Sequence, residues 1–427
     1  MCRSHLGGDS DNNPLTATQR NFLQTAIMQL VAKSLIPISF FVFIVGCSQK
    51  AEIEKRSFWD TQRRGSNGDA NDGLLEYFQV AEEFGIEMIR LSPADMKSES
   101  KDFLIGDIDD YHEIPEKDLQ RFIAVLNNAA ETQVKVVITF FGLPGARWRQ
   151  HNAMEFDYRL WEDFKYHEQS ARFWADLARE LKDHPAVVGY NILNEPHPER
   201  KDGFQSGQTD GFDDWLRENH DTPASLNLFY QRVIDAIREV DTETPIILDA
   251  RFHASPDGFD YFEPLEGDGL FYSCHFYSPW SYTTHRENKE RFSYPEHMPQ
   301  AGSEDTGYWG KEDMSALFDP VRHWLDRYNI PKEKLIVAEI GCDRRVGGAT
   351  QYLKDLIHTM NHENWHWGFY SFRSASWDGM DYELGSEKLN WKHWQAIEAG
   401  KSHNEIVNRH ENPLWNVVLN GLKRETP

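Results

Sequence analysis

Residues 186–196, "AVVGYNILNEP", join a nearly continuous apolar run to an abrupt polar ending. A run that is not restricted to alternate positions is typical of a strand buried on both faces in a parallel sheet. Asn194 and Glu195 follow at the carboxyl end of this run. Burying a carboxylate is costly unless it is paired with a partner or serves a function. The stretch therefore predicts a functional carboxylate at a strand end.

The same pattern of a short apolar run followed by an amphipathic helix recurs along the chain. Apolar residues spaced i, i+3, i+4, i+7 predict helices with one packed face at 74–81, 119–126, 174–181 and 226–233. Eight strands are expected, at residues 58–64, 85–91, 134–141, 186–193, 245–250, 269–277, 334–340 and 366–372. Eight such repeats predict a (β/α)8 TIM barrel as a single catalytic domain over residues 58–427.

Composition narrows the class of partner. The chain has 69 acidic and 45 basic residues, a formal net charge of −24, which disfavours nucleic acid and anionic membrane surfaces. A neutral substrate is more compatible with the negative electrostatic field of such a chain. The 14 Trp, 16 Tyr and 26 Phe residues include more rings than a sugar site needs, so we expect most of them in the core. We expect a monomer.

The N-terminal residues 1–47 predict export. The apolar stretch 35–46, "LIPISFFVFIVG", is short for a membrane-spanning helix and has the length of a signal-peptide core. Its end at Cys47 resembles a bacterial lipobox, in which the cysteine is lipidated. Met28 is the expected true start, and residues 48–57 are an expected linker. We therefore expect a lipoprotein anchored on the periplasmic or cell-surface side; the alternative is an uncleaved anchor.

Two cysteines, Cys274 and Cys342, fall within the expected domain. An exported protein could join them in a disulfide, but a domain of this size does not need one for stability. We expect two unpaired buried thiols, with a disulfide as the alternative.

Polar residues cluster at the expected carboxyl ends of the strands, where active sites of such barrels lie. They are Arg90, Asn194, Glu195, His275, Tyr277 and Glu339. Two carboxylates facing each other across the barrel mouth are what glycoside hydrolysis requires. A separation of roughly 5 to 5.5 Å predicts retention of the anomeric configuration, and about 6.5 to 9.5 Å predicts inversion.

The neighbours of the two glutamates assign their roles. Arg90 and Tyr277 beside Glu339 would favour its ionised form, which makes Glu339 the expected nucleophile. The nearby charge of Glu339 would raise the pKa of Glu195, the expected acid/base. The Asn194 amide is expected to bind the hydroxyl next to the reacting carbon. The long connection 278–331 is expected to form one wall of the cleft.

Four motifs together carry a family resemblance: "IRLSP" at 89–93, "NILNEP" at 191–196, "CHFY" at 274–277 and "IVAEIG" at 336–341. They resemble the strand-end motifs of glycoside hydrolase family 5, over roughly residues 58–400. The resemblance implies a retaining, cofactor-free glycosidase acting on a β-linked glucan or mannan. A glucosylated lipid or small glycoside is an alternative substrate, and a non-catalytic carbohydrate-binding lipoprotein is an alternative function.

Two positions depart from the family pattern. Phe141 stands where the family commonly has a histidine, and the strand-eight tryptophan below the cleaved sugar is displaced. Tyr370, Phe372 and Trp377 are the candidates for that aromatic, and we expect Trp377. Further aromatic residues are equally compatible with sugar platforms and with core or surface packing. They are Trp148, Trp280 and Trp309.

Other hydrolase classes lack their signatures in this sequence. No His-Glu-x-x-His motif lies on one expected helix, because "HENWH" at 362–366 places His362 in a loop and His366 in an expected strand. There is also no Gly-x-Ser-x-Gly elbow and no phosphate-binding glycine-rich loop. We therefore expect no metal and no cofactor. A metal-dependent barrel hydrolase, which a chelator would inactivate, is the remaining alternative within enzymes.

Overall fold

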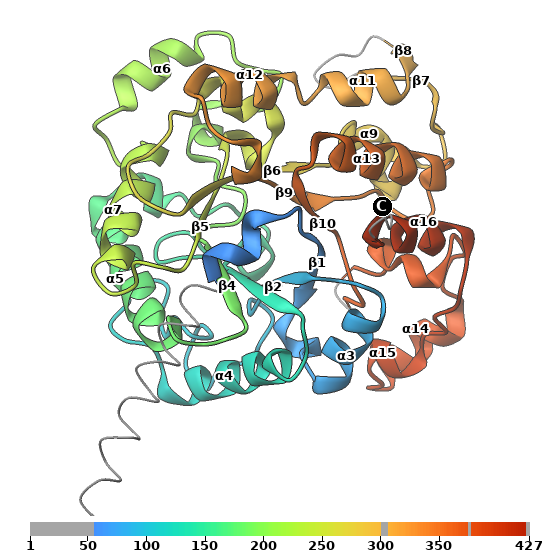
Figure 1. Cartoon of the computed structure of the whole chain (residues 1–427), viewed down its shortest axis with the longest axis horizontal. Helices are drawn as coiled ribbons and strands as arrows, with labels where there is room; N and C mark the ends of the chain where they lie inside the picture. Colours follow the sequence, from blue (N-terminus) through green and yellow to red (C-terminus); the bar gives the residue numbers. More distant parts are fainter. Residues whose placement is uncertain (1–54, 300–305, 375–376, 424–427) are drawn as a thin grey trace, which may run out of the picture. The chain divides into compact units, whose positions relative to one another are not determined.

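The computed structural model describes residues 55–299, 306–374 and 377–423. A closed barrel of eight parallel strands forms its centre, in the order β1-β10-β9-β6-β5-β4-β3-β2 (Figure 1). These strands are β1 (Arg64–Asp69), β2 (Met88–Ser92), β3 (Lys135–Thr139), β4 (Val187–Asn191), β5 (Ile246–Asp249), β6 (Leu270–Phe276), β9 (Leu335–Ile340) and β10 (His366–Phe369). The expected (β/α)8 barrel is confirmed. Residues 1–54, which include the expected signal segment and Cys47, lie outside the described residues.

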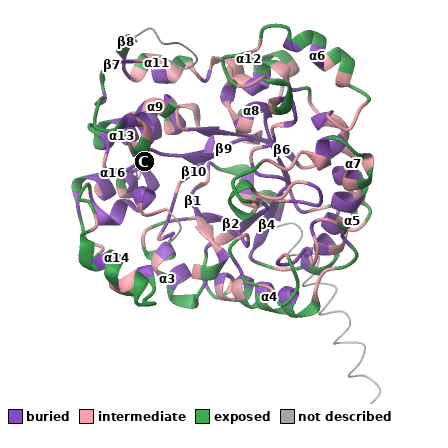
Figure 2. Ribbon diagram, turned by 180° about the vertical axis from the view of Figure 1, so that it is seen from behind, coloured by how far each residue is buried: buried purple, intermediate pink, exposed green. Residues whose placement is uncertain are grey.

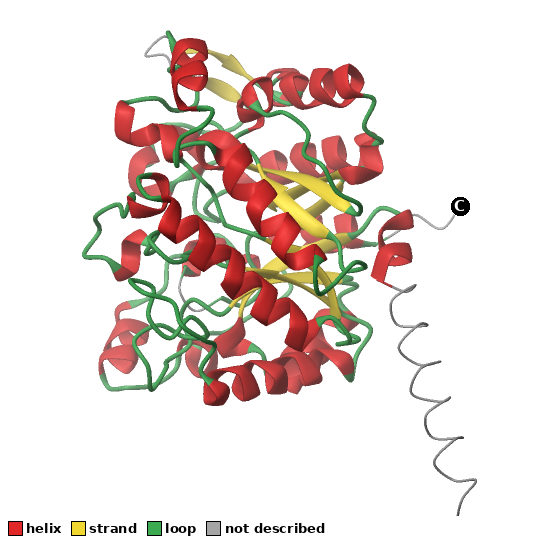
Figure 3. Ribbon diagram, turned by 90° about the vertical axis from the view of Figure 1, so that its left-hand side faces the viewer, coloured by secondary structure: helices red, strands yellow, loops and turns green. Residues whose placement is uncertain are grey.

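Helices surround the barrel, with buried faces on the strands and exposed faces outward (Figures 2 and 3). They are α3 (Leu75–Glu83), α4 (Glu116–Ala130), α5 (Phe164–Leu181), α6 (Phe212–Asn219), α7 (Leu226–Arg238), α8 (Arg251–Ala254), α9 (Trp280–Thr283), α10 (His285–Asn288), α11 (Lys311–Ala316), α12 (Asp319–Tyr328), α13 (Ala349–Glu363), α14 (Trp391–Glu398), α15 (His403–Ile406) and α16 (Pro413–Leu422). The predicted packed faces are largely confirmed; Leu74, however, precedes α3 and is 69% exposed.

The first strand was predicted in the wrong place. Residues 58–60 form a 3-10 helix, η1 (Phe58–Asp60), and the strand begins only at Arg64. Its sequence, "RGSNGD", contains no large apolar residue, so the hydrophobic pattern pointed to Phe58 and Trp59 instead. Gly65 is required there because a Cβ would lie 2.2 Å from the Met88 carbonyl oxygen on β2.

Trp59 instead closes the amino-terminal end of the barrel. It is 2% exposed and packs with residues that β2, β3, β4, β5, β6 and β9 contribute to the interior: Met88, Val137, Val188, Ile247, Phe271, Ile336 and Ala338. Its indole Nε1 donates to the Val188 carbonyl oxygen at 2.9 Å. Lys55, in the last part of the expected linker, donates to Thr244 Oγ1 at 3.0 Å.

Replacing Trp59 with alanine is expected to lower the free energy of unfolding by about 3–5 kcal/mol, because the buried indole would be lost and a cavity would remain at the amino-terminal end of the barrel. Urea denaturation followed by circular dichroism measures the change. Trp391→Ala is the matched control, since Trp391 is 67% exposed, and should stay within about 0.5 kcal/mol. Equal losses for both variants would contradict this role of Trp59.

The connection 278–331 contains α9, α10, a two-stranded antiparallel sheet of β7 (Glu296–Pro299) and β8 (Thr306–Trp309), α11 and α12. Cys274 and Cys342 are both buried free thiols, as expected. No helix among the described residues is both long enough and apolar enough to span a bilayer.

Candidate active site

A cleft of about 1460 Å³ opens at the carboxyl ends of the barrel strands. Residues at or after the carboxyl ends of all eight barrel strands contribute to its lining, as the barrel architecture predicts. The structure brings every predicted catalytic and substrate-binding residue to this cleft: Arg90, Asn194, Glu195, His275, Tyr277, Glu339 and Trp377.

Glu339 lies near the end of β9 and is 5% exposed. Its Oε1 accepts a hydrogen bond from Arg90 Nη1 at 2.6 Å, and its Oε2 accepts one from the Tyr277 hydroxyl at 2.7 Å. Both donors stabilise the carboxylate form. The predicted neighbours of Glu339 are therefore in place.

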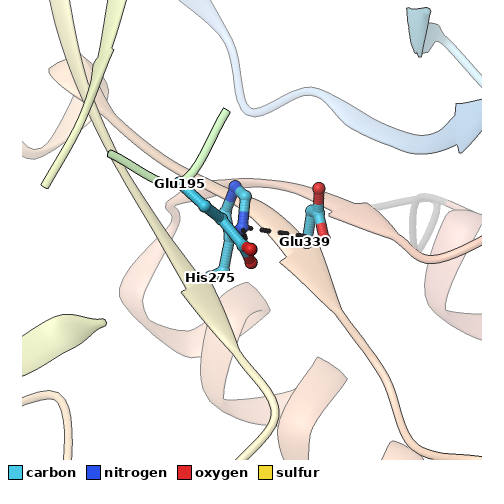
Figure 4. Close-up of side chains that lie close together, drawn as sticks. All are labelled: Glu195, His275 and Glu339. Carbon is cyan, nitrogen blue, oxygen red and sulfur yellow. Dashed lines mark hydrogen bonds and ion pairs between the residues drawn. The ribbon is translucent and has the colours of Figure 1, made fainter. Parts of the chain in front are cut away.

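Glu195 follows β4 and faces Glu339 (Figure 4). Its backbone has a left-handed φ of 51°, an uncommon conformation for a residue other than glycine. The Glu195 amide donates to Asp249 Oδ2 at 3.2 Å, which helps to hold this conformation. An oxygen of Glu195 and an oxygen of Glu339 lie within 4.8 Å of each other.

Burial raises the pKa of Glu195, and the charges of Glu339 and Asp249 raise it further, against the lowering effect of His275. The predicted direction of the shift agrees with the structure. Repulsion from Glu339, the predicted cause of the raised pKa, is not the largest one, because loss of hydration on burial contributes more.

His275 on β6 lies between three carboxylates. Its Nδ1 is 3.0 Å from Glu195 Oε1 and 3.6 Å from Glu339 Oε2, and its Nε2 is 3.4 Å from Asp249 Oδ2. Burial lowers the pKa of His275, but Glu339, Asp249 and the hydrogen bond to Glu195 outweigh it, so the net shift is upward. The upward shift favours the protonated form of His275, in which its charge would offset part of the acidic charge at the site.

Arg90 on β2 links several strand ends. Besides Glu339, its guanidinium donates to the side-chain oxygens of Asn191 at 2.7 Å, Asn67 at 3.1 Å and Asn194 at 2.7 Å. Arg90 is only 4% exposed. These bonds fix the amide of Asn194 with its oxygen toward Arg90, which leaves its nitrogen to donate elsewhere.

The sequence prediction missed three residues of this network: Asn67, Asn191 and Asp249. Asp249 is fully buried, ends β5 and accepts from Asn191 Nδ2 at 2.9 Å. The signal for it was present, because "PIILDA" ends a predicted strand on a carboxylate. Asn67 was missed because the first strand was misplaced.

Aromatic side chains form the cleft walls. Trp377 and Tyr370 line the cleft with ring centroids 5.8 Å apart, whereas Phe372 is 1% exposed and packs on Tyr77 in the core. Two of the three candidate aromatic residues therefore face the site. The assignment of Trp377 to the subsite floor stays a prediction.

Phe141 and Trp148 also line the cleft, and their ring centroids lie 5.1 Å apart. The departure at Phe141 thus creates an apolar wall where a histidine would offer a hydrogen bond. Trp280 lines the cleft at 50% exposure. Trp309 does not reach it, because it is 2% exposed and packs against Tyr294.

The oxygen and nitrogen atoms of Glu195, His275 and Glu339 are close enough for a metal ion. The surrounding chemistry disfavours one. Arg90 and Tyr277 already donate to the two oxygens of Glu339, and the Arg90 charge would repel a cation. The donor set fits a carboxylate pair better than a metal centre.

Comparison with known proteins finds a curated relative and several solved structures that are similar to this chain. A beta-xylosidase of Phanerodontia chrysosporium is 22% identical over 286 residues, which is 62% of this chain and 52% of that protein, so the match spans about half of the relative. Similar solved structures include an endoglucanase of Thermotoga maritima (TM-score 0.54, 17% identity, 77% of this chain and 94% of that one). Another is an endoglucanase of Pseudomonas stutzeri in complex with cellobiose (TM-score 0.53, 18% identity, 84% and 92%).

The family model described as Cellulase (glycosyl hydrolase family 5) matches residues 59–376, about three quarters of the chain. That range contains both glutamates and the whole network around them. The chain therefore belongs to glycosyl hydrolase family 5, a family of O-glycosyl hydrolases.

Proposed function

We propose that the protein is a retaining glycosidase that cleaves a β-linked glucan or mannan by double displacement. The observation that carries the proposal is the spacing of the two carboxylates. Their nearest oxygens lie within 4.8 Å, close to the roughly 5 to 5.5 Å of retaining enzymes and short of the about 6.5 Å at which room for an intervening water begins.

The first step uses the two glutamates in opposite protonation states. Glu195 gives its proton to the glycosidic oxygen as the bond from that oxygen to C1 breaks, and a Glu339 oxygen bonds to C1. The released alcohol departs and a glycosyl ester remains on Glu339. The raised pKa of Glu195 keeps its proton available, while Arg90 and Tyr277 hold Glu339 for attack.

The second step reverses the roles. Glu195, now a carboxylate, takes a proton from water as the water oxygen bonds to C1 and the ester bond to Glu339 breaks. Two inversions at C1 restore the original configuration. The Asn194 amide nitrogen, whose oxygen accepts from Arg90, is placed to donate to the hydroxyl next to C1 in both steps.

Proton NMR during the first minutes of hydrolysis tests the stereochemistry. A β-glycoside substrate is expected to release the β-anomer first, with the α-anomer appearing later by mutarotation. Initial release of the α-anomer would show inversion and contradict the double displacement.

The size and lining of the cleft support a glycan substrate over a small glycoside. Its volume of about 1460 Å³ exceeds the about 300–1,000 Å³ of pockets for drug-sized ligands, which leaves room for several sugar units. Product analysis on a panel of β-glucans and β-mannans, with aryl glycosides and a glucosylated lipid included, separates the alternatives. Binding without turnover throughout the panel would favour the carbohydrate-binding function.

We also propose export and a lipid anchor at Cys47, on the sequence pattern alone. The full-length protein expressed in a bacterial host is expected to enter the detergent phase on Triton X-114 partition. The Cys47→Ala variant, which removes the acylated thiol, is expected to stay out of it if a lipid is the sole anchor. Equal partition of both proteins would contradict a lipid at Cys47 as the sole anchor.

A further inference from the structure

Residues after β3, β4 and β5 form the cleft wall on the acid/base side. In the barrel order these strands lie across the mouth from β9, β10 and β1, which carry or adjoin Glu339 and Trp377. The wall contains Arg149, Phe156, His197, Arg200 and His253, all of which line the cleft. Because Glu195 protonates the departing oxygen, this wall faces the part of the substrate that leaves.

Two arginines in this wall carry unbalanced charge. The guanidinium carbons of Arg149 and Arg200 lie 4.9 and 4.7 Å from the centroid of the Phe156 ring. Arg149 Nε donates to the Met154 carbonyl oxygen at 2.7 Å. Within the part of the chain that the structure describes, neither guanidinium forms an ion pair with a carboxylate.

Other arginines of the same cleft do have acidic partners. Arg147 is paired with Asp102, and Arg345 with Asp343. Along the cleft, six arginines are matched by six aspartates and glutamates, whereas the whole chain has 69 acidic and 45 basic residues. Positive charge is therefore concentrated in the cleft relative to the rest of the protein.

His197 and His253 supply a flat surface beside these charges. Their rings stack with centroids 4.1 Å apart and an interplanar angle of 9°. Burial, with the neighbouring Arg200 charge, lowers the pKa of His197 to about 4, so the stack is neutral near pH 7. A neutral stack does not compete with the arginines for an anion and offers its face to a ring.

The backbone that presents His253 is unusual. Phe252, His253 and Ala254 have consecutive left-handed φ angles of 56°, 58° and 60°, which cost about 1–2 kcal/mol per residue. The buried Glu199 accepts from the Phe252 amide at 3.0 Å, and the His253 amide donates to the Pro196 carbonyl oxygen at 3.3 Å. Such strain is held most often at functional sites.

We infer that this wall is a leaving-group subsite for an anionic substituent, a carboxylate or a sulfate ester on the departing part of the glycan. The inference rests on the proposed function. The planar guanidinium forks of Arg149 and Arg200 match either group with paired hydrogen bonds, and the His197–His253 stack supports the ring that carries it. The chain has a net charge of −24, so the protein as a whole repels an anionic substrate. Any preference for an anion must therefore come from Arg149 and Arg200.

Matched aryl β-glycosides test the subsite, because the aryl group occupies the leaving-group side. The substrates are 4-nitrophenyl, 3-carboxy-4-nitrophenyl and 3-sulfo-4-nitrophenyl β-glucosides and β-mannosides. The preference is the ratio of kcat/KM for the anionic to the neutral substrate, normalised to the rates of the same pair in alkaline hydrolysis. We expect this preference to fall about tenfold or more in Arg200→Gln and Arg149→Gln, and less in Arg200→Lys.

Arg286→Gln is the matched control. Arg286 also lines the cleft, is in α10 of the connection after β6, and its Nε lies 3.5 Å from Glu287 Oε1. It should keep the wild-type preference. An unchanged preference in both Arg149 and Arg200 variants, or an equal loss in the Arg286 variant, would overturn the inference. The carboxylate and sulfonate arms, with the sulfonate standing in for a sulfate ester, show which anion is preferred.

Binding separates this inference from the proposed reaction. Calorimetric titration of the Glu339→Gln variant with the same neutral and anionic glycosides measures affinity without turnover. Tighter binding of the anionic glycoside that disappears on adding Arg200→Gln supports the subsite even if no glycoside is hydrolysed by the wild type. Hydrolysis with no charge-dependent binding supports the reaction and overturns the subsite. Thermal unfolding of each variant confirms that it is folded.

Discussion

Glu339→Gln is expected to lower kcat by about 10⁴-fold or more, the scale seen when an enzyme loses a covalent nucleophile. The amide keeps the size of the side chain and a partner for the Tyr277 hydroxyl, but it cannot form the glycosyl ester. Initial rates on aryl β-glycosides measure the loss. Glu333→Gln is the matched control, because the same change is made just before β9 (Leu335–Ile340) at its opposite end, and its kcat should be unchanged.

A slow substrate gives a direct check of this assignment. An activated 2-deoxy-2-fluoro glycoside is expected to leave its sugar as an ester on Glu339, found as a mass increase on the peptide that contains this residue. A label on another side chain, or an equal fall in rate in the Glu333 variant, would show that Glu339 is not the nucleophile.

Glu195→Gln is expected to lower kcat by about 10²–10⁴-fold for substrates with poor leaving groups, since general acid catalysis contributes on that scale. A dinitrophenyl glycoside needs little protonation, so its first step should be slowed much less and the glycosyl ester should accumulate. Rates across a series of aryl glycosides, plotted against the pKa of the leaving phenol, measure this difference. A loss independent of the phenol would contradict the role of Glu195.

The pH profile gives a second readout of the same residue. The first step requires Glu195 with its proton, so kcat/KM should fall as pH rises through its pKa. Since burial raises that pKa, the fall should begin above the range of an ordinary glutamate. In Glu195→Gln this alkaline limb should disappear. A limb that persists unchanged would assign it to another group.

The strand-end chemistry was predictable because motif and position agree. Glu195, His275 and Glu339 each follow or end an apolar run, and a closed parallel barrel brings such ends together whatever their distance along the chain. The first strand was less predictable, because Arg64 to Asp69 bury mainly backbone and small side chains. Without β1 in register, the contribution of Asn67 could not be seen.

Properties that depend on the loops were beyond the sequence. The stacking of His197 on His253 requires three left-handed residues that no local pattern announces, since Phe252 and Ala254 rarely adopt that conformation. Likewise, Arg149 and Arg200 are distinguished from Arg147 only by which carboxylates reach them. The pairing of charges in loops is set by tertiary structure.

Arg90 joins side chains from β1, β9 and the β4 segment through four hydrogen bonds. Arg90 thus holds Glu339 and the residue before Glu195 at the rim of the barrel, and it does so through side chains at strand ends instead of through the loops above them. Selection, natural or in the laboratory, can therefore change the sequences of those loops to bind new glycans while the catalytic residues keep their arrangement. The evolvability of the enzyme resides in this division of labour.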